Sequence, residues 1–161
     1  MIRKSLRISL GSDERSALTD FLEQELQRRG FQVELHGPLA GAPAPWPEVA
    51  EAVAERVANS QSDEGVLCCW TGTGVSIAAN KVPGVRAALC ADAETARGAR
   101  AWNAANVLCL SVRTTSEKAA REILDAWFSA RPDQSEADNV EKVRKLEERY
   151  RAGAEVKGGA R

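Results

Sequence analysis

The chain has 161 residues, of which 43% are hydrophobic and 28% are charged, and its formal net charge is −1. This length and composition are those of a single globular domain, and they exclude a disordered or collagen-like chain. A net charge this close to zero excludes a general attraction for nucleic acid or for an anionic membrane. A small anionic ligand is not excluded, because a pocket on a neutral protein can be locally basic.

The first residues and the cysteines point to a cytoplasmic protein. No apolar run approaches the roughly 18 residues that cross a bilayer, and MIRKSLRISLGSD alternates polar and apolar side chains where a signal peptide has an apolar core. Cysteines lie in or beside apolar runs without CxxC spacing, at Cys68, Cys69, Cys90 and Cys109. We expect reduced thiols. With His36 as the only histidine, no histidine-rich metal site is expected.

The first half of the chain alternates strand and helix patterns. Residues 6–10 alternate apolar and polar side chains and predict a strand, and residues 18–26 repeat apolar side chains at helical spacing. Residues 31–35 predict a second strand. The Pro- and Gly-rich residues 36–47 predict a loop, and residues 47–57 a helix with proline at its start.

The second half continues the alternation. Residues 66–69 form a short continuous apolar run, typical of a strand buried on both faces of a parallel sheet, and adjacent Cys68 and Cys69 then point to opposite faces. The Gly-rich turn at 72–74 leads into a short helix through residue 77. Residues 85–89 and 107–110 predict two more strands, separated by a helix over 95–102.

Five strand–helix units in series predict an α/β domain over residues 1–150. We expect a three-layer, Rossmann-like fold with a five-stranded parallel sheet, helices on both faces and right-handed crossovers. Helical patterns at 119–127 and 140–150 end the domain, and residues 151–161 are expected to form a disordered tail. Ligands in such sheets bind at the carboxyl ends of strands, which directs attention to Gly11–Glu14, Cys69–Ser76 and the chain after Leu89.

The loop after Cys69 contains the residues best suited to chemistry. Gly72 and Gly74 allow close approach of the backbone to a ligand, and free N–H groups at the start of a helix can hold an anionic oxygen. Thr71 and Ser76 add hydroxyl donors, and a thiol before such a helix can act as a base or nucleophile. The same residues also fit a tight strand-to-helix turn with a buried thiol. The loop is neither a Walker A loop nor a full GxGxxG fingerprint.

Residues 69–87, CWTGTGVSIAANKVPGVRA, resemble the type-B ribose-5-phosphate isomerases and the related galactose-6-phosphate isomerase subunits. The loop of that family reads Cys-Gly-Thr-Gly-x-Gly and is followed by Ser-Ile-Ala-Ala-Asn-Lys. GSD at residues 11–13, the TARGAR segment and NAANVL at residues 103–108 agree with the family as well. The similarity extends over the whole chain except its tail.

The resemblance implies an aldose–ketose isomerisation of a sugar or sugar phosphate through an enediolate, without a metal or other cofactor. Cys69 takes the place of the base that moves a proton between C1 and C2, and Thr71 that of the hydroxyl that assists proton transfer between the oxygens. Backbone amides correspond to an anion hole for the enediolate at Gly72, Thr73, Gly74, Val75 and Ser76.

Other positions and the assembly follow from the same resemblance. Asp13 and Asn103 correspond to positions that contact substrate. Arg113 corresponds to a family arginine, for which a surface or interface role is the alternative. Sites in this family form between two subunits, so a homodimer is implied, and a tetramer is a further possibility.

Several family positions at the expected site are altered. Glu14 replaces a histidine, Trp46 a tyrosine, Trp70 a glycine and Trp102 the histidine that opens the sugar ring. The segment that aligns with the phosphate-clamping arginines, QSEADN at 134–139, contains no basic residue.

These changes allow two interpretations. Tryptophan faces stack on the C–H faces of sugar rings, so the pocket can be rebuilt for another sugar whose phosphate is absent or held differently. Alternatively, the chain is a non-catalytic or regulatory paralogue that binds a sugar or serves as a partner subunit. A nucleotide-binding or redox module fits poorly, because the chain has neither a dinucleotide fingerprint nor CxxC.

Overall fold

Five parallel strands form one sheet in the order β2-β1-β3-β5-β4. The computed structural model describes residues 5–158, with side chains as far as Gly153. The strands are β1 (Arg7–Ser12), β2 (Gln32–His36), β3 (Glu64–Cys69), β4 (Ala87–Leu89) and β5 (Val107–Ser111). The predicted α/β class with a five-stranded parallel sheet is therefore confirmed.

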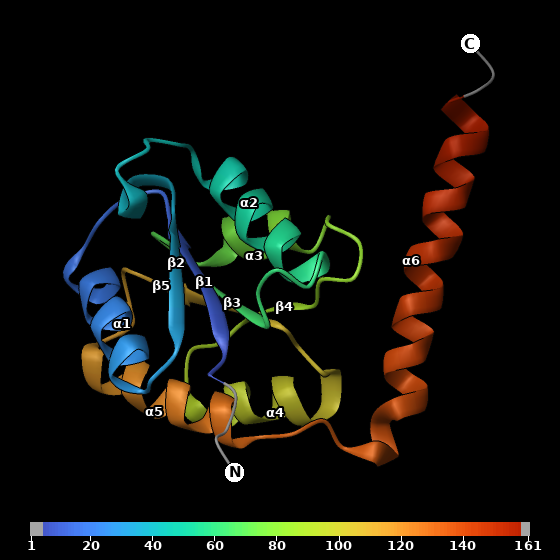
Figure 1. Cartoon of the computed structure of the whole chain (residues 1–161). Coiled ribbons are helices and arrows are strands. Elements are labelled where there is room, and N and C mark those ends of the chain that lie inside the picture. Colours follow the sequence, from blue (N-terminus) through green and yellow to red (C-terminus); the bar gives the residue numbers. More distant parts are fainter. Residues whose placement is uncertain (1–4, 159–161) are drawn as a thin grey trace.

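Helices cover both faces of the sheet (Figure 1). One face carries α1 (Ala17–Arg28), α4 (Ala93–Asn103) and α5 (Glu117–Ser129). The other carries α2 (Trp46–Ala58) and α3 (Thr73–Ala79). Short 3₁₀ turns follow β2 and precede the last helix, at η1 (Gly37–Ala40) and η2 (Gln134–Glu136).

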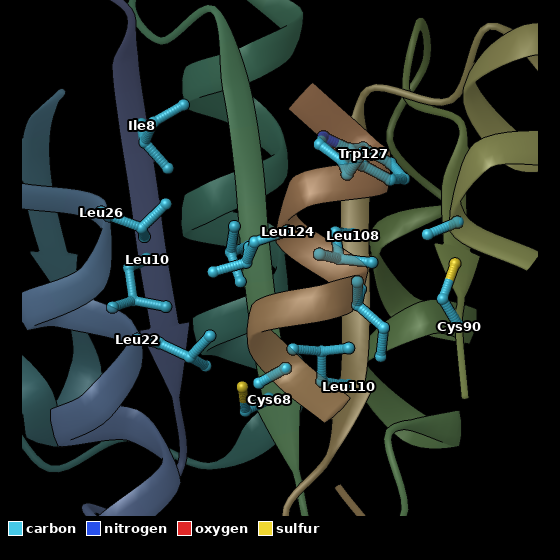
Figure 2. Packing of buried hydrophobic residues seen from close by; sticks show 14 of the residues in the cluster. Ile8, Leu10, Leu22, Leu26, Cys68, Cys90, Leu108, Leu110, Leu124 and Trp127 are labelled. Atoms are coloured by element: carbon cyan, nitrogen blue, oxygen red, sulfur yellow. The ribbon is translucent and has the colours of Figure 1, made fainter. Parts of the chain in front are cut away.

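The core divides into two layers because successive side chains of a strand point to opposite faces. Figure 2 shows the layer beneath α1 and α5, where Leu10 of β1 and Leu108 of β5 meet Leu22 and Trp127. Each such fully buried side chain contributes roughly 1.5–3 kcal/mol to folding. Cys68 lies in this layer and Cys69 in the opposite one, which confirms the prediction for this pair.

Most element boundaries differ by one or two residues from the sequence prediction: β1, for example, ends at Ser12 and β3 begins at Glu64. The fourth strand begins at Ala87 instead of Val85, because Val85 turns into the core and the Arg86 N–H donates to Asn106 Oδ1 (2.8 Å) outside the strand ladder. The last helix, α6 (Ala137–Gly158), continues through residues 151–158, where the sequence predicts a disordered tail. Residues 159–161 of that tail lie outside the described residues.

Helix α6 stands clear of the rest of the domain (Figure 1). Its apolar residues Val143, Leu146 and Tyr150 remain 51%, 47% and 72% exposed. They line one side of an open groove of about 1080 Å³, and the turn before β4 lines the other side. The Gly84 N–H of that turn donates to the Glu147 carboxylate of α6 (3.0 Å). Among residues 5–158, no helix combines the length and the apolar composition needed to span a bilayer.

Strand order determines where a ligand can bind. Helix α1, which follows β1, packs on one face of the sheet, and α2, which leads into β3, packs on the other. The connections therefore leave on opposite faces at the neighbouring strands β1 and β3, and ligands bind in α/β sheets at such a point, at the carboxyl ends of the strands. The parallel register pairs Ser12 with Cys68, which brings Asp13 and Cys69 to the same edge of the sheet.

A buried charged cluster holds the opposite end of β3. Glu64 is 8% exposed and its Oε1 lies 2.8 Å from Arg100 Nη2 of α4. Its other oxygen accepts a hydrogen bond from Trp127 Nε1 of α5, and the Arg100 guanidinium lies 5.2 Å from the centre of the Trp127 ring. Burial raises the pKa of Glu64, and the positive charge of Arg100 opposes that rise.

We expect Arg100→Met to lower the free energy of unfolding at pH 7 by about 3 kcal/mol, because it leaves a buried carboxylate without its partner. A carboxyl group whose pKa is raised on folding destabilises the protein increasingly as the pH rises above its ordinary value of 4.5, so the loss should shrink at pH 5. Urea denaturation at both pH values measures this.

The matched control is Arg97→Met, which removes an exposed arginine of the same helix that pairs with Glu94. Its cost should stay below about 1 kcal/mol at either pH. An equal loss for Arg100→Met at pH 5 and pH 7 would contradict the assigned role of Glu64.

Candidate active site

A cavity of about 280 Å³ opens between the carboxyl ends of β1 and β3. It brings together residues from the β1 loop, the start of α2 and the glycine-rich loop: Asp13, Trp46, Cys69, Trp70, Thr71, Thr73 and Gly74. All of these are residues that the sequence predicts for the site. The chain therefore builds one half of the expected site from segments far apart in the sequence.

The remaining predicted residues lie outside this cavity. Trp102 and Asn103 line a different cavity of about 440 Å³, between β4 and α4. Glu14 and Arg113 are exposed near the same edge of the sheet, and neither lines the Cys69 cavity. Val75 is fully buried beneath the loop and packs in the core with Cys69.

Cys69 is the thiol that reaches the cavity. It ends β3 and is 6% exposed. Burial raises the pKa of Cys68 and of Cys90 to about 12, and it raises the pKa of Cys109 well above its ordinary value. Those thiols stay protonated near neutral pH, so they cannot act as bases there.

Gly72 forms the turn after Cys69, and its geometry admits only glycine. Its φ is +75°, in the left-handed region. A Cβ on this residue would lie 2.9 Å from the Leu110 carbonyl carbon and 2.5 Å from Leu89 Cδ1. The loop therefore folds back against the backbone of β5 only because this position has no side chain.

Ser111 holds the loop from the β5 side, and sequence reasoning missed it. Its hydroxyl donates to the Trp70 carbonyl (2.9 Å), which also accepts from the Arg113 N–H (3.0 Å). The parallel register places Ser111 beside Cys69. The available signal was a polar residue at the end of an otherwise apolar strand, in the run VLCLS.

The glycine-rich loop also presents hydrogen-bond donors. Thr71 and Thr73 share a hydrogen bond between their hydroxyls (2.7 Å). The N–H groups in the first turn of a helix have no intrahelical partner, which in α3 applies to Thr73, Gly74 and Val75. The Ser76 N–H donates to the Gly72 carbonyl (3.3 Å), so that amide is engaged within the helix and does not belong to the donor group.

The three tryptophans expected in one pocket are divided between two places. Trp46 is 41% exposed, and its ring lies against Gly74, where a Cβ would be 3.1 Å from Trp46 Cε3. Trp70 is 59% exposed at the same cavity. Trp102 instead folds over Gly98 of its own helix, where a Cβ would be 2.6 Å from Trp102 Cζ3. Within a single chain the three tryptophans do not share one cavity.

The charge of the Cys69 cavity is negative. Asp13 is its one carboxylate, and no lysine or arginine is among the described residues that line it. The Asp13 Oδ1 atom is buried and has no hydrogen-bond partner among the described residues. Within residues 5–158, no three histidine, cysteine, aspartate or glutamate side chains gather as metal ligands would.

The sequence and the fold both match known sugar isomerases. Residues 8–146 match the Ribose/Galactose Isomerase family model. D-erythrulose-4-phosphate isomerase of Pectobacterium atrosepticum is 35% identical over 146 residues, which cover 86% of this chain and 93% of the relative. Ribose-5-phosphate isomerase B of Escherichia coli is 36% identical over 125 residues, which cover 77% of this chain and 84% of the relative.

Solved structures agree with these matches. Ribose-5-phosphate isomerase B of Clostridium thermocellum superposes with a TM-score of 0.84 at 35% identity, covering 90% of this chain and 99% of that one. The Mycoplasma genitalium enzyme with bound ribulose-5-phosphate superposes with a TM-score of 0.82 at 34% identity, covering 91% and 99%.

We expect Gly72→Ala to destabilise the protein by roughly 3 kcal/mol, because it adds a collision with the β5 backbone to the strain of a left-handed residue. Gly84→Ala is the matched control, since Gly84 also has a positive φ (84°) but nothing lies within 4 Å of the position that a Cβ would occupy there. It should cost only about 1 kcal/mol. Chemical denaturation of both variants measures the difference, and equal losses would contradict the packing argument.

Proposed function

The chain belongs to the ribose/galactose isomerase family, and we propose that it interconverts an aldose and a ketose with Cys69 as the base that moves the carbon-bound proton. The observation that carries this proposal is the position of Cys69 at the cavity, directly before a loop of free amides and paired hydroxyls. The other cysteines are held protonated in the core.

The proposed reaction passes through an enediolate. Cys69, as a thiolate, removes the proton from the carbon next to the substrate carbonyl, and the carbonyl oxygen becomes negative. The N–H groups of Thr73 and Gly74 face this charge, where preorganised donors lower the barrier most. Thr71 assists the movement of a proton between the two oxygens, and Cys69 returns its proton to the neighbouring carbon.

Asp13 and the tryptophans are proposed to orient the sugar. The buried Asp13 Oδ1 lacks a partner in the described part of the chain, so a substrate hydroxyl can satisfy it. Trp46 and Trp70 border the same cavity and offer apolar faces to the C–H groups of a sugar. Together they favour a polyhydroxylated ligand over a flat, fully apolar one.

The phosphate end of the family's substrates has no counterpart at this cavity. A phosphate dianion is normally held by arginine or lysine. No such residue lines the cavity within the described chain, and residues 134–139, which align with the family's phosphate-binding arginines, contain none either. We infer that the substrate is an unphosphorylated sugar, or one whose phosphate is held more weakly than in the enzymes named above.

A homodimer is proposed to complete the site. Trp102 and Asn103 lie at the end of α4, and the Asp133 N–H donates to the Ala101 carbonyl (2.8 Å), which brings residues 134–139 to the same place. These are the residues that align with the family's ring-opening and phosphate-binding positions. Since they are separate from the Cys69 cavity in one chain, a second copy supplies them, and the half-exposed face of α6 provides further contact area.

We expect deuterium from heavy water to enter a substrate sugar next to its carbonyl in the presence of the wild-type protein and not with Cys69→Ala. The probes are D-erythrulose 4-phosphate, D-ribulose 5-phosphate, D-galactose 6-phosphate and the three unphosphorylated parents, followed by NMR. Cys68→Ala is the matched control, because this thiol faces the core and should leave exchange intact. No exchange with any of the six sugars would favour the alternative of a non-catalytic sugar-binding or partner subunit.

We also expect kcat/KM for D-ribose 5-phosphate to be roughly 100-fold below that of the E. coli enzyme assayed beside it, because one or two charge-assisted phosphate contacts are missing. The loss should appear mainly in KM for the phosphate-bearing sugar, and unphosphorylated D-ribose should not show a comparable deficit. Equal kcat/KM values for D-ribose 5-phosphate in the two enzymes would overturn the proposed loss of phosphate recognition.

A further inference from the structure

Thr71 and Thr73 place two hydroxyl groups side by side in the Cys69 cavity. Their oxygens lie 2.7 Å apart, and both side chains line the cavity. Residues two apart in an extended strand are separated by roughly 6.6 Å. The left-handed turn at Gly72 between them brings the hydroxyls into contact.

An isomerase has a use for two adjacent hydroxyls. When a proton leaves C1 of a ketose, O2 becomes negative while O1 keeps its proton. The aldose forms only if O1 loses that proton and O2 gains one. The two oxygens of a cis-enediolate lie side by side on neighbouring carbons, so a hydrogen-bonded pair of hydroxyls can face both at once.

We propose that Thr73 is a second catalytic hydroxyl, and that it forms with Thr71 a relay that carries the proton from O1 to O2. The relay rests on the proposed function of the Cys69 site. O1 gives its proton to one threonine oxygen, that threonine gives its own proton to the other, and the second threonine protonates O2. Each threonine ends with one proton, and no further reactant is needed.

A purely structural role for Thr73 predicts something different. Thr73 is the first residue of α3, and the preceding Gly72 has no side chain to cap the helix. If the hydroxyl pair only orders the start of α3, losing it should lower stability and weaken every step of catalysis together. The relay predicts that one step fails while another continues, because carbon–proton exchange depends on Cys69 and not on the threonines.

The test compares exchange with isomerisation in heavy water, starting from D-erythrulose 4-phosphate, D-ribulose 5-phosphate and their unphosphorylated parents. In Thr73→Val, aldose formation should fall on the order of 100-fold while deuterium enters the recovered ketose within about threefold of the wild-type rate. Thr73→Ser keeps the hydroxyl and should restore aldose formation. Thr71→Val should behave like Thr73→Val.

Two controls separate this from misfolding. Thr114→Val makes the same chemical change at an exposed position outside the cavity and should leave both rates unchanged. Thermal unfolding of each variant is followed by circular dichroism, and Thr73→Ala replaces the valine variant if that one is unfolded.

The outcomes distinguish the relay from the function on which it rests. If exchange and aldose formation fall together in Thr73→Val, or if neither changes while Thr71→Val loses aldose formation, the relay is wrong and the role of Cys69 stands. If the wild type exchanges no ketose, or Cys69→Ala exchanges as fast as the wild type, the proposed function itself fails and the relay fails with it.

Discussion

The parallel pairing of β3 between β1 and β5 is the constraint on which the rest of the structure depends. It places Ser12 beside Cys68 and Cys69 beside Ser111, so three strands end at one edge. At the other end of β3, the buried Glu64 joins α4 and α5 to the sheet through Arg100 and Trp127. The strand is thus held at its first residue by charge and at its last by backbone contacts, and the glycine-rich loop begins directly after that last contact.

The glycine-rich loop joins this rigid frame to the cavity. Gly72 lies against the Leu110 backbone without space for a Cβ, and the Trp70 carbonyl is held by Ser111 and Arg113. A loop tied at both ends keeps its amides and hydroxyls in fixed positions before a ligand arrives. Fixed donors stabilise developing charge better than mobile ones, because they need not reorganise during the reaction.

The positions that differ from the family pattern lie at separate places in the fold. Cys69 and Thr71, proposed for proton transfer, share one cavity with Asp13, proposed to orient the sugar. Trp102 and Asn103 belong to the end of α4 and line another cavity. Under the proposed function, a change at the end of α4 affects ring opening and phosphate binding and leaves Cys69 in place. Trp46 and Trp70 alter the walls of the Cys69 cavity and leave the spacing of Cys69 and Thr71 along the chain unchanged.

The family relationship, the strand and helix order, and the residues around Cys69 could all be predicted from the sequence, because they depend on local periodicity and on a contiguous motif. Boundaries such as Ala87, and the role of Ser111, could not, because they depend on partners supplied by distant segments. Residues 151–158 are helical, whereas the composition of that segment predicted disorder.

Only the tertiary structure decided which predicted site residues meet. The motif around Cys69 is local, so its sequence largely determined the proposed base, the turn and the adjacent hydroxyls. Whether Trp46 or Trp102 shares that cavity depends on strand order and helix placement: the start of α2 returns to the loop, and the end of α4 does not. A comparison of sequences places both tryptophans among the site positions, but in the fold only Trp46 lies at the Cys69 cavity. The reason is that α2 and α4 pack on opposite faces of the sheet, which fixes where each helix end lies.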